Sequence, residues 1–104
     1  LRRLVAGVQA ELRREFPDSG RRPPLLVKVA PDLSERDVRD VAAVALELGV
    51  DGLVVGNTTT GRPPEVQFCA NAHEAGGLSG TPLMERSTRV LGDMYRATGG
   101  RLPL

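Results

Sequence analysis

The feature that most constrains the fold is a strand–helix–strand pattern between residues 25 and 56. Residues 25–30 (LLVKVA) and 53–56 (LVVG) are short runs with apolar residues at both odd and even positions. Such runs are typical of strands that are covered on both faces in a parallel sheet. Between them, Ser34 is a good helix N-cap and Gly49 a good helix stop. Two strands joined by a helix through short connections predict a right-handed parallel crossover, and hence an α/β fold.

Further helices are predicted on either side of this unit. Residues 1–16 carry apolar side chains at helical spacing, and Pro17 ends that helix. Pro82 suits the first turn of another helix, which Gly99 closes, and residues 101–104 begin a further strand. The two predicted apolar stripes consist of Leu1, Leu4, Val5, Val8, Leu12 and Phe16, and of Leu83, Val90, Leu91, Met94 and Thr98.

Residues 58–82 contain several Gly and Pro and little periodicity, which predicts a long loop. Loops longer than about 12 to 15 residues without structure are usually functional or disordered. Because this loop follows the carboxyl end of a strand, where α/β folds bind ligands, we expect a functional loop.

A two-stranded parallel sheet alone leaves both edges open and much of the apolar helix surface uncovered. The chain also begins at Leu1, inside a predicted helix and without an initiator Met. We therefore expect residues 1–104 to be a contiguous part of a larger α/β barrel or doubly wound sheet.

Composition argues against several functions. The net charge is +1, and residues 1–22 contain six Arg and three acidic residues. This surplus of positive charge is too small to indicate a nucleic-acid partner, so we expect none. A single cysteine, Cys69, cannot form an internal disulfide, and His73 has no second His or Cys at ligand spacing, so we expect no metal site. No apolar run approaches the ~20 residues that a membrane span needs.

Lys28 is the most informative single residue, since it is the only lysine beside thirteen arginines and lies within a predicted strand. One interpretation is an edge-strand lysine that reaches water or prevents aggregation. The other is a point cation directed into a barrel interior toward an anionic ligand or an electron-rich ring, where the larger, forked Arg side chain would not fit.

Two polar or glycine-rich clusters follow the second strand. Asn57-Thr58-Thr59-Thr60 offers amide and hydroxyl groups that suit a small polar substrate, or that equally satisfy a local turn. Residues 76–80 (GGLSG) permit either a close approach of backbone amides to a ligand or an ordinary turn. Simpler structural roles are expected for the turn and helix-cap residues Asp32, Ser34 and Asp37 and for the solvated helix face of Arg86, Arg89 and Arg96.

Three segments in this order, residues 25–34 (LLVKVAPDLS), 51–63 (DGLVVGNTTTGRP) and 76–104, resemble the class 2, quinone-linked dihydroorotate dehydrogenases. The resemblance implies part of a (β/α)8 TIM barrel, with this chain supplying about strands 5 and 6 and their flanking helices to a single FMN-binding domain. It implies oxidation of dihydroorotate to orotate in pyrimidine biosynthesis, with FMN as cofactor and ubiquinone as electron acceptor.

By motif match, Lys28 lies beside the flavin, Gly56 and Gly80 contact FMN through backbone groups, and Asn57 and Thr58 bind dihydroorotate or orotate. Gly56 stands where the family commonly has Thr, which keeps a backbone contact and removes a hydroxyl. The loop from Arg62 to Leu78 is expected to help cover the site.

The family's catalytic serine, its FMN phosphate loops and its membrane-contacting helices all fall outside this chain by the same match. We therefore expect no catalytic residue here, and no activity of the chain in isolation. The implied location is the mitochondrial inner membrane or, alternatively, the bacterial cytoplasmic membrane. Two other hypotheses are a non-catalytic truncated product that acts as an interaction segment, and a different FMN barrel with another substrate, against which the Asn57-Thr58 pair argues.

Overall fold

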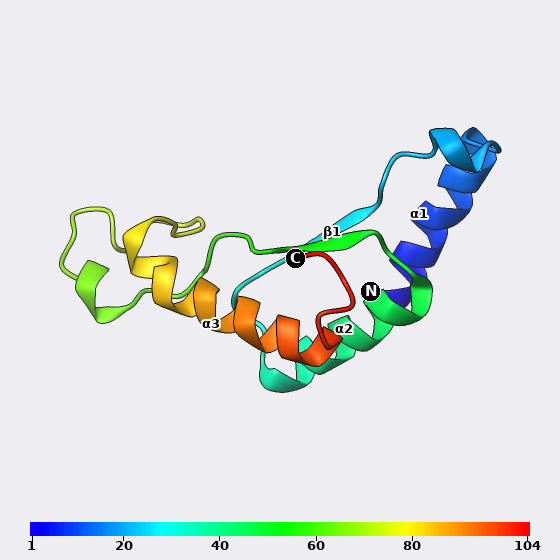
Figure 1. Ribbon diagram of the computed structural model, residues 1–104. Coiled ribbons are helices and arrows are strands. Elements are labelled where there is room, and N and C mark those ends of the chain that lie inside the picture. The colour runs from blue at the N-terminus through cyan, green and yellow to red at the C-terminus, as the bar shows by residue number, and fades with distance from the viewer.

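The computed structural model describes residues 1–104, apart from the side chain of Ser19. Three helices and a two-stranded parallel sheet form an elongated molecule of about 53 × 27 × 21 Å (Figure 1). The elements, in chain order, are α1 (Arg2–Glu15), the short 3-10 helix η1 (Ser19–Arg21), β1 (Leu26–Val29), α2 (Glu35–Leu48), β2 (Gly52–Val55), η2 (Pro64–Val66) and α3 (Thr81–Thr98).

The predicted crossover is confirmed: β1 and β2 pair in parallel, and α2 connects them. The register sets Leu26 opposite Gly52 and Val29 opposite Val55. Asp51 ties the two strand starts together, because its backbone N–H donates to the Leu25 carbonyl at 2.9 Å and its carboxylate accepts from the Leu25 N–H at 2.6 Å.

Local sequence signals define both ends of α2. The Ser34 hydroxyl accepts from the Asp37 N–H, and the Asp37 carboxylate accepts from the Ser34 N–H, which forms a reciprocal capping box. Gly49 ends the helix with φ 61°, a left-handed conformation that glycine adopts without steric cost. The predicted cap and stop are therefore confirmed.

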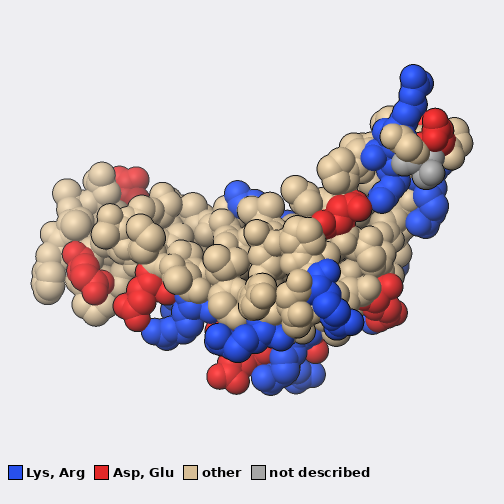
Figure 2. All heavy atoms as spheres, in the orientation of Figure 1, with Lys and Arg blue, Asp and Glu red and all other residues tan. Residues whose placement is uncertain are grey.

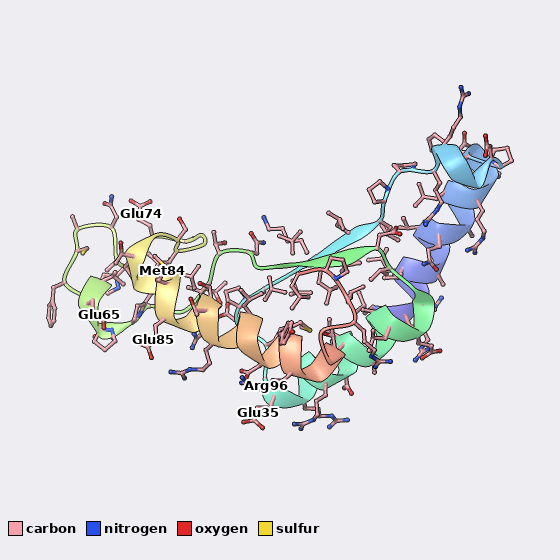
Figure 3. All side chains as sticks on the ribbon, in the orientation of Figure 1. Glu35, Glu65, Glu74, Met84, Glu85 and Arg96 are labelled. Carbon is pink, nitrogen blue, oxygen red and sulfur yellow. The ribbon has the colours of Figure 1, made fainter. Side chains whose placement is uncertain are left out.

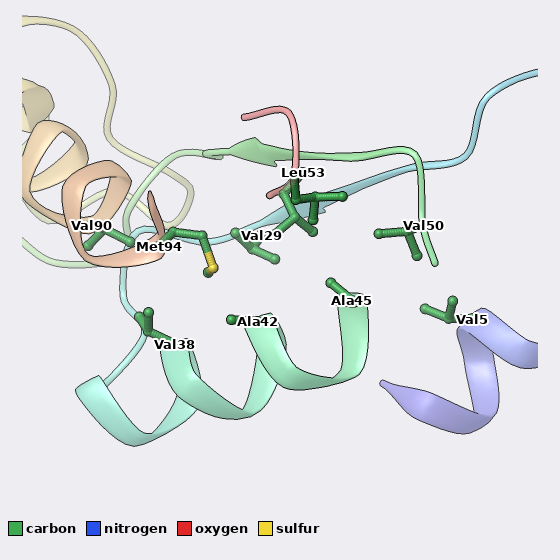
Figure 4. Packing of buried hydrophobic residues seen from close by; sticks show 10 residues of the cluster. Val5, Val29, Val38, Ala42, Ala45, Val50, Leu53, Val90 and Met94 are labelled. Carbon is green, nitrogen blue, oxygen red and sulfur yellow. The ribbon is translucent and has the colours of Figure 1, made fainter. Parts of the chain in front are cut away.

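The core lies between one face of the sheet and the helices α2 and α3 (Figures 1 and 4). Val29 and Leu53 point to that side, and Met94 of α3 is fully buried beside them. Burial of such a side chain contributes about 1.5–3 kcal/mol. The remaining buried members of this cluster are Val5, Val38, Ala42, Ala45, Val50, Val90 and Leu102.

The opposite face of the sheet is bare. Leu26 is 54% exposed and Val54 40% exposed, and Lys28 lies on the same face of β1 as Leu26. Of the two strand faces that the sequence pattern predicts to be covered, the described chain covers one, and no segment that the structure describes packs on the other.

The first helix is correctly predicted, but most of its apolar stripe is not buried. Of the six stripe residues, only Val5 enters the core, while Leu4 remains 70% exposed. The helix is joined to α2 mainly by a hydrogen bond from the Gln9 amide to the Leu48 carbonyl, at 2.7 Å, and by an ion pair between Arg2 and Glu47. Because α1 projects away from the sheet, little of the chain can cover its stripe (Figure 1).

The last helix and the segment after it differ from expectation in two details. Leu91 was expected in the buried stripe of α3 but is 38% exposed, since it lies off the face that carries Val90 and Met94. Residues 101–104 form no assigned strand; instead, the Pro103 carbonyl accepts a single hydrogen bond from the Leu53 N–H, at 3.0 Å. One such bond continues the sheet beyond β2 without making a ladder.

On the face drawn in Figure 2, charged side chains of both signs lie mainly along the lower edge and at the end that carries α1. Several pair one helical turn apart, as Arg89 does with Glu85 at 2.8 Å, and exposed pairs of this kind contribute little to stability. Within the described chain, no helix combines the length and apolar character that crossing a bilayer demands.

Candidate functional site

Candidate ligand-binding residues gather at the carboxyl ends of β1 and β2. Lys28 lies opposite Val54 in the register, and residues 56–60 follow β2 directly. The Asn57 N–H donates to the Val29 carbonyl at 2.8 Å, so the turn after β2 remains attached to the end of β1. This edge of a parallel sheet is where α/β proteins bind ligands.

Lys28 has an exposed side chain on the bare face of β1. Every ion pair among the described side chains uses an arginine, so the single lysine has no carboxylate partner there. Its neighbours in the sequence, Val27 and Val29, point to the opposite, helix-covered face. An unpaired ammonium on an apolar strand face suits an anionic or electron-rich ligand.

The polar cluster after β2 divides into two parts. Asn57 and Thr58 are exposed, and neither side chain hydrogen-bonds to another described residue. Thr59 is only 3% exposed, and its hydroxyl donates to Asp32 at 2.5 Å while accepting from the Gly61 N–H at 2.9 Å. Of the four residues 57–60, the first two therefore keep their polar groups available for a ligand.

Asp32 lies in the turn between β1 and α2, as predicted, but its side chain makes long-range contacts that the sequence did not indicate. The capping of α2 is performed by Ser34 and Asp37, whereas the Asp32 carboxylate reaches across to the turn after β2. The pKa of Asp32 lies below its ordinary value, chiefly because the Thr59 hydroxyl donates to it, with smaller contributions from the Thr60 N–H and Arg86. Asp32 is thus an ionised acceptor beside the candidate site.

The glycines of this region differ in what prevents or permits a side chain at their positions. A Cβ at Gly56 would lie 2.6 Å from the Val29 carbonyl oxygen, and one at Gly77 would lie 1.9 Å from the Thr58 hydroxyl oxygen. Gly80, immediately before α3, has φ 82°, and a side chain there would meet nothing closer than 4.0 Å. Gly77 thus sits directly against Thr58, while the space beside Gly80 is open to a ligand.

The sequence analysis predicts a long loop without regular structure, but part of this loop is regular. Residues 64–66 form η2, and Thr59 and Leu78 exchange two backbone hydrogen bonds of 3.0 and 2.7 Å. The loop extends beyond the strand ends, where Glu65 and Glu85 of α3 line one pocket (Figures 1 and 3).

Arg62 organises this loop, a role that the sequence analysis missed. Its guanidinium donates at 2.8–3.2 Å to five backbone carbonyls, those of Thr60, Gly61, Ala72, Glu74 and Gly76. A guanidinium has five N–H donors, so this set occupies them all. The sequence feature that could have indicated this role is that Arg62 is the single arginine of the loop at residues 58–82.

Other candidates lie outside the site. His73 and Cys69 are exposed in the loop, and no group of three or more metal-ligating side chains occurs among the described residues. Arg89 and Arg96 are exposed on α3 as predicted, and each pairs with a carboxylate of its own helix. Arg86 instead pairs with Asp32, at 2.5 Å.

The family model for dihydroorotate dehydrogenase matches residues 1–104. The chain is 58% identical over 104 residues to a dihydroorotate dehydrogenase (quinone) of Parvibaculum lavamentivorans, and 51% identical over 105 residues to a mitochondrial dihydroorotate dehydrogenase (quinone) of Oryza sativa. Each alignment covers all of this chain, and 28% and 22% of the relative, respectively.

The fold has a similar match among solved structures. A crystal structure of DHODH from Eimeria tenella in complex with ferulenol superposes with a TM-score of 0.87 and 41% sequence identity. That alignment covers 97% of this chain and 30% of the other. The chain therefore spans about a quarter of the length of the curated relatives that it matches.

Proposed function

The chain belongs to the dihydroorotate dehydrogenase family, and we propose that it forms the fifth and sixth strands of a (β/α)8 barrel. The complete barrel would oxidise dihydroorotate to orotate in pyrimidine biosynthesis, with ubiquinone as the electron acceptor. The observation that carries the proposal is the bare strand face with its unpaired lysine, next to the free Asn57 and Thr58 side chains. We call the polypeptide that completes this barrel around the chain the intact protein.

The topology supports a barrel. Helices α2 and α3 cover one face of the sheet, as the outer helices of such barrels do, and the uncovered face would become the interior. Neither edge of the sheet is paired with a further strand among the described residues. The far edge of β2 makes one hydrogen bond, from the Leu53 N–H to the Pro103 carbonyl. Both edges can therefore accept further strands.

The residues present fit FMN as the cofactor. The Lys28 ammonium has no internal partner, and the backbone beside Gly80 is open, so a cation and an approachable peptide unit are both available. Gly56 would contribute backbone groups only. The bound flavin would supply the two-electron acceptor that dihydroorotate oxidation needs, and Lys28 would stabilise negative charge on its reduced ring.

Asn57 and Thr58 would bind the substrate. An amide offers both donors and an acceptor, and a hydroxyl offers one donor and two acceptor lone pairs, which match the carboxylate and the ring N–H and C=O groups of dihydroorotate. Because both residues precede the fixed Thr59, their side chains project from a held backbone. No residue of this chain is proposed as the catalytic base.

The proposed partners other than substrate are ubiquinone and a membrane surface reached through parts of the protein outside this chain. We propose the mitochondrial inner membrane, with the bacterial cytoplasmic membrane as the alternative, since the similar quinone enzymes include both mitochondrial and bacterial proteins. Fractionation of the source cells, followed by detection of the intact protein in one of these membranes, tests this assignment.

The substrate assignment is tested by Asn57→Ala in the intact protein. Loss of hydrogen bonds to a charged ligand costs about 1.5–3 kcal/mol, so we expect the Kd for orotate to rise roughly 10- to 100-fold with FMN content unchanged. Asn71→Ala is the matched control, because Asn71 is also exposed but lies in the loop between η2 and α3. Unchanged orotate affinity in Asn57→Ala would favour an FMN barrel with another substrate.

A further inference from the structure

Asp32 joins three segments that are distant in the sequence. It lies in the turn between β1 and α2, and its carboxylate accepts hydrogen bonds from the Thr59 hydroxyl at 2.5 Å and from the Thr60 N–H at 3.1 Å. Its third partner is the Arg86 guanidinium of α3, at 2.5 Å. The carboxylate therefore connects both strand ends of the candidate site to the helix that follows.

The bond to Thr59 is the least solvated of these contacts. Thr59 is 3% exposed and the Asp32 side chain 28%, whereas the Arg86 side chain is 54% exposed. Hydrogen bonds to a charged acceptor are stronger when they are shielded from water, while exposed ion pairs contribute little. The hydroxyl and amide of residues 59 and 60 are therefore the main partners of Asp32.

This contact holds the backbone next to the free pair Asn57 and Thr58. On one side of the pair, the Asn57 N–H is bound to the Val29 carbonyl. On the other side, Thr59 is held by Asp32 and by the two backbone bonds to Leu78. A three-residue span fixed at both ends has little freedom, so the direction of the two free side chains depends on these anchors.

We propose that Asp32 is a positioning residue for substrate binding, which acts through Thr59 to orient Asn57 and Thr58. The inference rests on the proposed function, because it names how the same site is held. It assigns Asp32 no contact with substrate or cofactor. Helix α2 does not need Asp32 for its N-terminus, since Ser34 and Asp37 already form the capping box.

The first test is Asp32→Asn in the intact holoenzyme. Asparagine keeps the size of the side chain but replaces one acceptor oxygen by an NH₂ donor, so the Thr59 and Thr60 donors no longer both find an acceptor. We expect the KM for dihydroorotate to rise about tenfold, with FMN content and the rate of reoxidation of the reduced flavin by quinone unchanged. Asp37→Asn is the matched control: it weakens the cap of α2 and should leave that KM unchanged.

A second pair of variants tests the route through Thr59. Thr59→Ser keeps the hydroxyl and should retain the wild-type KM, whereas Thr59→Val removes it and should raise the KM as Asp32→Asn does. In the double variant Asp32→Asn/Thr59→Val, the KM should rise no further than in either single variant, because both remove one interaction. If Asp32→Asn does not fold, the KM values of Thr59→Ser and Thr59→Val alone test the positioning role.

Equal KM values in Thr59→Val, Thr59→Ser and wild type would overturn the proposal, as would loss of FMN together with substrate affinity. Failure of the proposed function has a different signature. In that case Asn57→Ala itself leaves substrate affinity unchanged; if Asn57→Ala weakens binding while the Asp32 and Thr59 variants do not, only the positioning role fails.

Discussion

At the scale of single residues, the chemistry of the site depends on which polar groups lack partners within the chain. Lys28 was singled out in the sequence because a lone lysine within an apolar strand is costly to bury. The structure places it on the bare face of β1, without an ion pair to any described residue. Asp32 is the turn residue that the sequence predicts, but its hydrogen bonds to Thr59 and Thr60 could not be predicted, because these partners lie 27 and 28 positions away. Only the folded sheet brings them together.

Lys28→Ala in the intact protein should lower the reduction potential of the bound flavin and slow its reduction by dihydroorotate at least tenfold. The reason is the loss of the cation that stabilises negative charge on the reduced ring. Lys28→Arg should not restore the rate, because the forked guanidinium is larger and less compact than an ammonium. Anaerobic stopped-flow reduction and a redox titration measure both quantities; unchanged values in Lys28→Ala would contradict the assignment.

The Asp32 contacts also predict a pH dependence. Its pKa in the folded protein is lowered, mainly by the Thr59 hydroxyl, so folding favours the ionised form. The resulting stabilisation is fully present above the unfolded value of about 3.9 and is lost as the pH falls through the lower folded value. Denaturant unfolding of the intact protein at pH 6 and pH 3 should show a stability difference between wild type and Asp32→Asn that shrinks at pH 3. An equal difference at both pH values would contradict this linkage.

At the scale of elements, the loop between β2 and α3 depends on one side chain. Arg62 donates from all five of its N–H groups to backbone carbonyls, so it supplies the bonds that a regular element would provide. The same loop carries Gly77, whose backbone leaves no room for a Cβ beside the Thr58 hydroxyl. The order of the loop is thereby linked to the orientation of Thr58, which is proposed to bind the substrate.

Arg62→Lys should loosen this loop, because an ammonium has three donors and cannot span five carbonyls. We expect amide hydrogen exchange over residues 72–78 to accelerate about tenfold or more in the intact protein, while exchange in α2 stays unchanged. Arg89→Lys is the matched control, since Arg89 makes only an exposed pair with Glu85. Exchange in Arg62→Lys equal to that in the control would show that another interaction holds the loop.

The regular elements were largely predictable from the sequence, and the contacts between them were not. Apolar spacing together with Ser34, Gly49 and Gly99 located all three helices to within a residue or two, because helix signals are local. The hydrogen bonds of Asp32 and Arg62 could not be predicted, since they depend on loop geometry. Burial was overestimated at Leu4 and Leu91, because periodicity indicates which face is apolar but not whether anything covers it.

At the scale of the whole molecule, the chain is less compact than its length allows. The radius of gyration is 16.3 Å, against about 13 Å for a compact domain of this size. Exposed apolar side chains lie on α1 and on the bare face of the sheet, Leu4 and Leu26 among them. Both surfaces are those that the rest of a barrel would cover, which supports the proposal that the chain works within a larger fold.

The isolated 104-residue chain should therefore bind a hydrophobic dye such as ANS strongly and show no FMN-dependent oxidation of dihydroorotate. The physical reason is that its apolar faces are uncovered and that the proposed function assigns the catalytic base to a part of the barrel outside this chain. Fluorescence titration and a turnover assay with added FMN check the two expectations, with the intact protein as the control. Turnover by the isolated chain with bound FMN would refute the expectation of inactivity.

In the proposed function, the bare strand face and the turn after β2 form one ligand site. A crystal structure of the intact protein with FMN and orotate tests it most directly. We expect β1 and β2 as neighbouring barrel strands, the Lys28 ammonium beside the flavin ring, and the Asn57 and Thr58 side chains within hydrogen-bond distance of orotate. Orotate bound elsewhere, or a Lys28 that faces solvent away from the flavin, would contradict it.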